Sequence, residues 1–308
     1  MKALALGLSL TAACTVGSGI TAPTGSGGDD TQSDAGVTPP DGISGHITAS
    51  ATWMGTVNII GDTTIDPGVT VTVQAGAVVN VAANMSIVVL GTLDAEGTSA
   101  AKITIQPANA ALHFGAPDAG ITVGASALTV GSSPQPGTLI MKYVNQTGGS
   151  LRVFGSGTAT VTDSTFSKAD GDLLQMSDTA SLDFEYSSIG LTAAGDTTHC
   201  DMHFSTPAGS ALTSIKMSHS NVSTSAYGIM FYAGTNADFT FDNWFMNSTT
   251  NLDPTIGSVS GDFSSGYFDV IPASISTPTT GITANTLATA MLPACNGTNN
   301  PSCAGPHQ

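Results

Sequence analysis

Positive charge is nearly absent from this chain, and charge of either sign is scarce. Charged residues make up 9% of the 308 positions and only six are Lys or Arg, so the formal net charge is -16. A typical soluble domain carries about 25% charged residues. Nucleic-acid binding and docking on anionic lipid headgroups both need clustered positive charge. We therefore expect no nucleic-acid partner.

Strong helix formers are also few. Glu, Lys, Arg and Gln are scarce, and Ser, Thr, Asn and Gly supply the polar surface instead. No stretch of useful length shows helical periodicity. Hydrophobic residues make up 41% of the chain, which is enough to fill a core. This composition favours an all-β protein in which uncharged hydroxyls and amides stack from coil to coil.

Residues 1–14 are typical of an export signal. Lys2 precedes an apolar run of about eleven residues, which is too short to span a bilayer. Residues 10–14 resemble a bacterial lipobox, although Leu10 stands one position further from Cys14 than usual. Lipidation of Cys14 would give an outer-membrane or cell-surface lipoprotein, because no Asp follows it. An ordinary secretory signal cut near Ala13 is the alternative, and the protein would then be secreted.

Two segments flank the expected folded body. Residues 15–43 contain almost no large apolar side chain, which predicts a flexible tether. Residues 271–308 form a Pro/Thr-rich tail in which Cys295 and Cys303 could close a small disulfide loop, leaving Cys200 unpaired. We expect contact with the membrane only through the N-terminal lipid.

Short β-branched runs separated by Gly, Asp-Pro and Asn begin near Trp53, and they predict strands and turns. In the second half these units repeat at intervals of 22, 23, 33 and 24 residues, which indicates a solenoid. The aligned apolar positions are Val144, Phe166, Ile189, Val222 and Met246. Two residues earlier, three of five positions are Ser. Five residues earlier lies an apolar column that we expect to face the interior: Leu139, Val161, Phe184, Met217 and Phe241.

The runs from Gly68 to Ile105 resemble the opening coils of bacterial surface right-handed parallel β-helix proteins with the pectate-lyase-like fold. Residues 257–268 resemble their closing coil. The resemblance implies a single-stranded right-handed parallel β-helix over residues 44–270 of a surface lipoprotein. It supports no particular activity, because lyases, hydrolases and adhesins share this architecture.

Cleavage of acidic polysaccharides is the enzymatic hypothesis for such a fold. A lyase needs a Lys or Arg base and Ca²⁺ held by several carboxylates, and no basic residue of this chain stands in a lyase-like pattern. A hydrolase needs clustered acids. Asp163, Glu185 and Asp242 come near one coil position, with Asp163 one column away from the other two. Solvated surface carboxylates are the simpler interpretation.

Potential metal ligands are densest at His199-Cys200-Asp201-Met202-His203. Imidazole and thiolate together suit Zn²⁺ or copper. On a strand, however, Cys200 would face away from His199 and His203. We therefore expect no cofactor, with Ca²⁺ or a transition metal held by His199, Cys200 and His203 as the alternative.

Exposed aromatic side chains are the better candidates for ligand binding. Tyr143 and Phe245 share a column in the alignment and should point outward, as in a glycan-binding face. Thr-x-Thr pairs such as Thr70/Thr72 could bind ice, but they do not recur at every coil. The preferred function is a non-catalytic cell-envelope protein that is structural or binds a polysaccharide or cell-surface partner. A lyase or hydrolase acting on acidic polysaccharide is the alternative.

Overall fold

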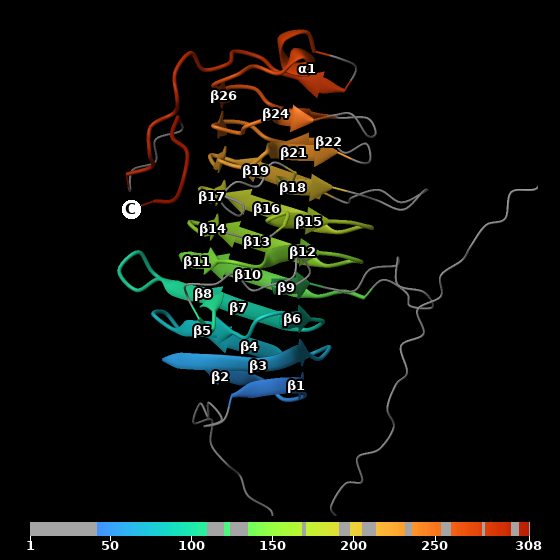
Figure 1. The fold of residues 1–308 in the computed structure, drawn as a ribbon, viewed down its shortest axis with the longest axis vertical. Helices are drawn as coiled ribbons and strands as arrows, with labels where there is room; N and C mark the ends of the chain where they lie inside the picture. The colour runs from blue at the N-terminus through green and yellow to red at the C-terminus, as the bar shows by residue number, and fades with distance from the viewer. Residues whose placement is uncertain are drawn as a thin grey trace, which may run out of the picture. The chain divides into compact units, whose positions relative to one another are not determined.

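The computed structural model describes residues 42–109, 120–123, 135–167, 171–190, 198–204, 214–231, 236–253, 260–278, 281–296 and 302–307. These residues form a parallel β-helix (Figure 1), so the predicted all-β fold class is confirmed. The predicted export signal, Cys14 and the predicted tether up to residue 41 lie outside the described residues. Within the described part of the chain, no helix is long and apolar enough to cross a membrane.

Each regular coil contains three short strands, and each strand pairs in parallel with its counterpart one coil later. One strand of every coil belongs to a ten-stranded sheet. The other two belong to two ladders of a seventeen-stranded sheet, which meet at the long strand β3 (Thr56–Ile65). β1 (Ile43–Ile47) pairs with β3 and opens the β-helix.

The strands divide among the three ladders as follows. The ten-stranded sheet contains β2 (Ala51–Trp53), β4 (Thr70–Val73), β7 (Thr92–Glu96), β10 (Thr138–Lys142), β13 (Thr158–Thr162), β16 (Ser181–Glu185), β19 (Ser214–Ser218), β22 (Asn236–Asp238), β25 (Ser260–Asp262) and β27 (Ile282–Thr283). After β3, the first ladder contains β5 (Val78–Val81), β8 (Ile103–Pro107), β11 (Val144–Thr147), β14 (Thr165–Ser167), β17 (Ser188–Gly190), β20 (Asn221–Ser223), β23 (Asn243–Phe245) and β26 (Tyr267–Phe268). The second ladder contains β6 (Ser86–Val89), β9 (Gly120–Val123), β12 (Ser150–Val153), β15 (Leu174–Met176), β18 (Cys200–Phe204), β21 (Tyr227–Phe231) and β24 (Thr250–Asp253).

Alternation along each strand fills the interior. In β4, for example, Val71 and Val73 are buried while Thr70 and Thr72 face outward, because successive side chains of a strand point to opposite faces. Stacking repeats this division in every coil, so the inward side chains merge into one continuous core.

The register corrects the predicted alignment at both of its ends. Phe166 pairs with Gln146, not Val144, and Trp244, not Met246, pairs with Val222. A slip of two residues keeps the alternation of faces within a strand, because strand side chains repeat with a period of two, but it moves residues near the strand ends, such as Met246, into turns. The interior column is therefore Met141, Val161, Phe184, Met217 and Phe239.

Phe241, which we expected in this interior column, lies in a turn instead. It has a positive φ of 60° and is half-buried. Its ring stacks on His219, with 4.8 Å between the ring centroids.

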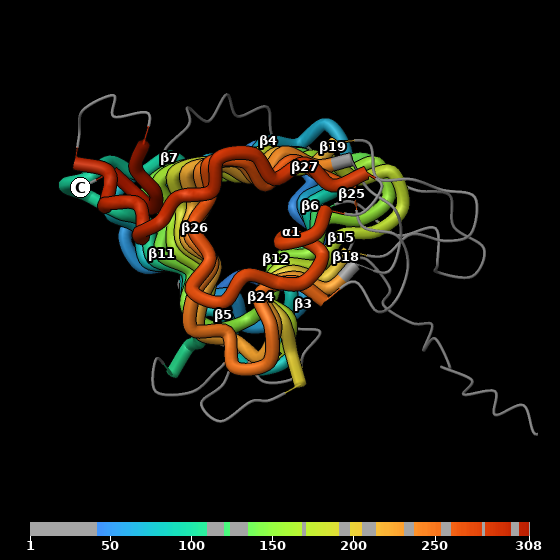
Figure 2. Tube along the Cα trace, turned by 90° about the horizontal axis from the view of Figure 1, so that it is seen from above, coloured from blue at the N-terminus to red at the C-terminus, as the bar shows by residue number. Residues whose placement is uncertain are grey.

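Strand pairing continues beyond the expected boundary at residue 270, since β27 pairs with β25. Between β26 and β27, α1 (Ala273–Ser276) buries Ile275 against the core. Figure 2, which looks down the axis from this end, shows α1 within the outline of the coils. The helix thus covers an end at which core side chains would otherwise meet solvent.

The C-terminal tail runs back along the side of the late coils (Figure 1). Cys295 and Cys303 form a disulfide, with 5.1 Å between their Cα atoms. Beyond it, the backbone N–H of Gly305 donates to the carbonyl of His219 at 2.7 Å. Nδ1 of His307 lies 2.6 Å from the Asp163 carboxylate, so the last residues bind the turns directly.

Candidate functional site

The three candidate catalytic carboxylates occupy three different columns. Glu185 pairs with Thr162 and Ser218 at the end of the ten-stranded sheet. Asp163 aligns with the residue after Glu185, in the turn that follows the strand; this position of each coil is here called the turn column. Asp242 aligns one position further along the coil. The expectation that Glu185 and Asp242 share a column was wrong, because the two-residue slip at the last unit went undetected.

Each of these carboxylates has a structural partner. The Asp163 carboxylate accepts a hydrogen bond from the backbone N–H of His307 at 3.0 Å and also contacts the His307 ring. Glu185 forms an ion pair with Lys216 Nζ at 2.6 Å and accepts a hydrogen bond from Ser218 Oγ at 2.9 Å.

Asp242 ends a ladder of buried hydroxyls at the corner between the ten-stranded sheet and the first ladder. The hydroxyls of Ser164, Ser187 and Ser220 each accept a backbone N–H from the preceding coil, at 3.0 to 3.2 Å. The N–H of Ser220 donates in turn to Asp242 Oδ1 at 2.8 Å. Burial raises the pKa of Asp242 well above its usual value, and this single N–H only partly offsets the effect. Its carboxyl is fully buried, away from any substrate.

The two candidate aromatic side chains do face outward, but they do not share a column. Tyr143 occupies the turn column with a φ of 51°, beside Asp163 of the next coil. Desolvation and the Asp163 carboxylate raise the pKa of Tyr143. Phe245 lies on β23, where it pairs with Ser223. The two rings therefore do not form one binding platform.

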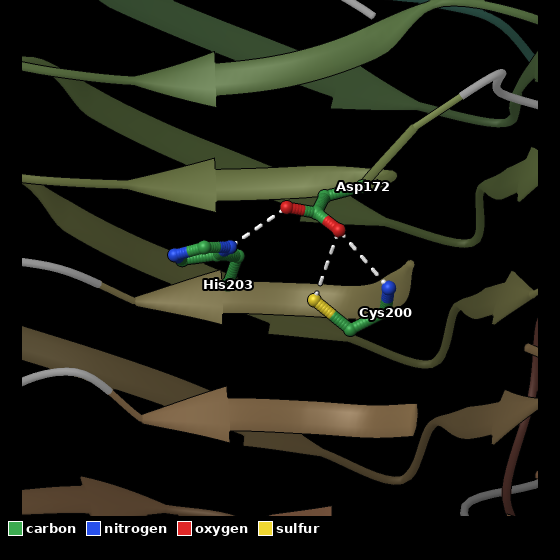
Figure 3. A group of neighbouring side chains, drawn as sticks. All are labelled: Asp172, Cys200 and His203. Carbon is green, nitrogen blue, oxygen red and sulfur yellow. Dashed lines mark hydrogen bonds and ion pairs between the residues drawn. The ribbon is translucent and has the colours of Figure 1, made fainter. Parts of the chain in front are cut away.

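A cluster of Asp172, Cys200 and His203 lies at the second ladder (Figure 3). The Cys200 thiol and its backbone N–H lie 3.1 Å and 3.0 Å from Asp172 Oδ1. Nδ1 of His203 lies 2.7 Å from Oδ2 of the same carboxylate. Among the described residues, this is the group of His, Cys, Asp or Glu whose ligand atoms, all within 4.8 Å of one another, could hold one metal ion.

Burial and hydrogen bonding have opposite effects within this cluster. Burial disfavours ionisation of Asp172, but its hydrogen bonds with His203 and Cys200 outweigh that effect and lower its pKa. For Cys200, burial and the adjacent Asp172 charge both favour the thiol, so its pKa is strongly raised. Without a cation, the cluster is thus a carboxylate bound by a neutral thiol and an imidazole.

Sequence reasoning found two of these three residues. It missed Asp172, which lies 28 residues before Cys200 and comes close only because β15 pairs with β18. The sequence also predicted that Cys200 and His203 point to opposite faces of a strand and therefore lie apart. In the structure, the Asp172 carboxylate contacts both of them, one with each oxygen. His199, the third predicted ligand, bonds to the hydroxyl of Thr198 at 3.2 Å and is outside the cluster.

The outer face of the ten-stranded sheet carries a second feature that the sequence showed only in part. The register aligns hydroxyl side chains in six successive coils, and none of them is buried. They are Thr70, Thr92, Thr138, Thr158, Ser181 and Ser214, here called the hydroxyl column.

The column beside it is mixed, with two acidic residues and one Lys. Two residues further along each strand, it contains Thr72, Asp94, Ile140, Thr160, Asp183 and Lys216. The Thr-x-Thr motif marked only part of this face, because the second column varies and the hydroxyl column changes from Thr to Ser at Ser181 and Ser214.

Comparison of the chain with protein-family models, with curated proteins and with solved structures found no match.

Proposed function

We propose that this chain is an exported, non-catalytic cell-envelope protein that binds neutral polysaccharide along the hydroxyl column. Each hydroxyl of this column can donate and accept hydrogen bonds. Successive coils space the hydroxyls by about 4.8 Å. A row of six such groups suits an extended polymer that presents hydroxyls of its own. This row is the observation that carries the proposal.

Charge favours a neutral polymer over an acidic one. The neighbouring column presents two carboxylates, Asp94 and Asp183, against one ammonium group, that of Lys216, and the whole chain has a formal net charge of -16. Like charges repel an anionic ligand as it approaches. The predicted lipid on Cys14 would hold the β-helix at the outer membrane or cell surface.

The alternative, an enzyme acting on acidic polysaccharide, has less support. Asp163, Glu185 and Asp242 lie in separate columns and are bound by His307, Lys216 and Ser220. An acid/base pair in a glycosidase must flank one bond. Turnover of a uronate polymer by the purified protein would favour the enzyme over the binding protein.

The test is a pull-down with insoluble neutral and acidic polysaccharides. The triple variant Thr70→Val, Thr92→Val, Thr138→Val removes three hydroxyls of the column with little change of shape. We expect about a tenfold or greater loss of affinity for a neutral polymer, because each net hydrogen bond contributes about 1 kcal/mol. Binding of the wild type to none of the neutral polymers would contradict the proposal.

A matched control is available on the seventeen-stranded sheet. Thr64, Thr104 and Thr122 also face outward and are half-buried. Their triple replacement by Val should leave binding unchanged. Equal losses in the two triple variants would show that the hydroxyl column is not the binding face.

A further inference from the structure

We propose that Asp172, Cys200 and His203 form a binding site for one Zn²⁺ ion. The carboxylate lies between the other two side chains, with Sγ of Cys200 3.1 Å from Oδ1 and Nδ1 of His203 2.7 Å from Oδ2 (Figure 3). All three ligand atoms lie within 4.8 Å of one another. An ion bound at about 2.0–2.3 Å from each atom needs only small side-chain movements.

The donor set matches Zn²⁺ better than other common cations. Sulfur, nitrogen and oxygen ligands together are typical of zinc, whereas Ca²⁺ and Mg²⁺ take oxygen ligands. The thiolate and the carboxylate supply two negative charges, so a divalent ion leaves a neutral centre. Cu⁺ would leave one negative charge in a largely buried place, which is unfavourable.

The protons balance in a simple way. On binding, the Cys200 thiol releases one proton to solvent, because a coordinating thiol is deprotonated by the metal. His203 binds the ion through Nδ1 and carries its proton on Nε2. Asp172 binds as the carboxylate that its hydrogen bonds with Cys200 and His203 stabilise.

The surroundings provide support and an entry side. Parallel pairing of Leu174 with Met202 holds Asp172 beside β18. The backbone N–H of Cys200 also donates to Asp172 and can keep orienting it after metal binding, as outer hydrogen bonds do in metal sites. Cys200 is fully buried, but the His203 side chain is 27% exposed, so an ion from solvent would reach the cluster from the His203 side.

The test uses the full chain with Cys14→Ser, so that Cys200 is the remaining free thiol, and no affinity tag containing His. Co²⁺ replaces Zn²⁺ as the probe because a thiolate ligand gives a near-ultraviolet charge-transfer band with Co²⁺. We expect the band to saturate at one equivalent and to disappear when Zn²⁺ is added. Cys200→Ser should abolish it, and His203→Ala should weaken binding by about tenfold or more.

The matched control is His46→Ala. His46 forms another His–Asp pair, with Nδ1 2.7 Å from Asp66, but within the described part of the chain it belongs to no group of three possible metal ligands. This variant should bind Co²⁺ like the parent protein.

If Cys200→Ser does not fold, Asp172→Asn serves in its place, and circular dichroism of the metal-free variants checks the fold. The absence of a charge-transfer band from the parent protein would overturn the proposal. So would undiminished binding in folded Cys200→Ser or Asp172→Asn. None of these readouts depends on polysaccharide binding, so this proposal can fail independently of the function proposed above.

Discussion

The coils on either side of Thr138 fill their interiors differently. In the early coils, residues 51–123, the core is almost entirely Val, Ile, Leu and Ala, with Trp53 as the only buried aromatic residue described there. In the late coils, residues 138–283, the core contains Phe and Trp side chains in contact with one another. Among the described residues, every buried polar or charged side chain except Thr63 lies between Gln146 and Asn251.

The same corner of the coil is built in two ways. In the early coils, a turn after β4 is closed locally: Ala77 N donates to Gln74 O at 3.0 Å, and Gly76 supplies a φ of 79°. In the late coils, Asp163 and Ser164 make the turn between β13 and β14, and the N–H of Ser164 donates to the hydroxyl of Ser187 in the next coil. Both corners bond to the next coil, since Gly76 N also donates to Ala101 O at 3.0 Å, but the early corner uses glycine and backbone groups whereas the late corner uses polar side chains.

This difference predicts that single substitutions will damage the late coils more. Trp244 is fully buried and stacks on Phe268, with 5.7 Å between ring centroids. Trp244→Ala should lower the free energy of unfolding by about 3–5 kcal/mol, measured by urea denaturation. The early-coil comparison, Ile87→Ala, also truncates a buried side chain to Ala and should cost less, about 2–3 kcal/mol. Similar losses for both would remove the energetic contrast between the regions.

The serine ladder gives a prediction of intermediate size. Ser187→Ala leaves the buried N–H of Ser164 without its acceptor, which should cost about 1–3 kcal/mol. Ser214→Ala removes an exposed hydroxyl of the ten-stranded sheet and should change stability by less than about 0.5 kcal/mol. Both are measured by urea denaturation. Hydrogen exchange at Ser164 that stays slow in Ser187→Ala would show that the ladder is not needed there.

The smallest effect concerns pH. Burial raises the pKa of Asp201 and of Asp242. A carboxyl whose pKa is raised on folding binds its proton more tightly when folded, so its stabilisation is present in acid. That stabilisation is lost as pH rises above about 4, where the unfolded carboxyl ionises. The free energy of unfolding should therefore fall between pH 4 and neutrality.

Asp242→Ser continues the serine ladder and should make this fall shallower. Glu96→Gln, which removes one exposed charge from an early coil, is the control for the net charge. Denaturation curves at several pH values would check both variants. A slope in Asp242→Ser equal to that of the wild type would exclude Asp242 as a source of the pH dependence.

The sequence predicted the fold well and the positions of side chains along the axis less well. Strand alternation predicted which side chains face the interior, and Leu139 and Phe184 are buried as this pattern predicts. Because a shift of two residues preserves that alternation, the pattern alone could not detect the slips at Val144 and Met246. The shared column of Tyr143 and Phe245 was lost for this reason.

The amino-acid sequence by itself determined that this chain is β-rich, that it stacks short repeating units, and that hydroxyls instead of charges cover it. These properties depend on composition and on a local period of two. Only the tertiary structure decided which side chains meet across coils, such as Asp172 with Cys200, or the aligned hydroxyls from Thr70 to Ser214. Such contacts depend on how many residues each turn contains, and insertions between strands change that number without altering the strands themselves.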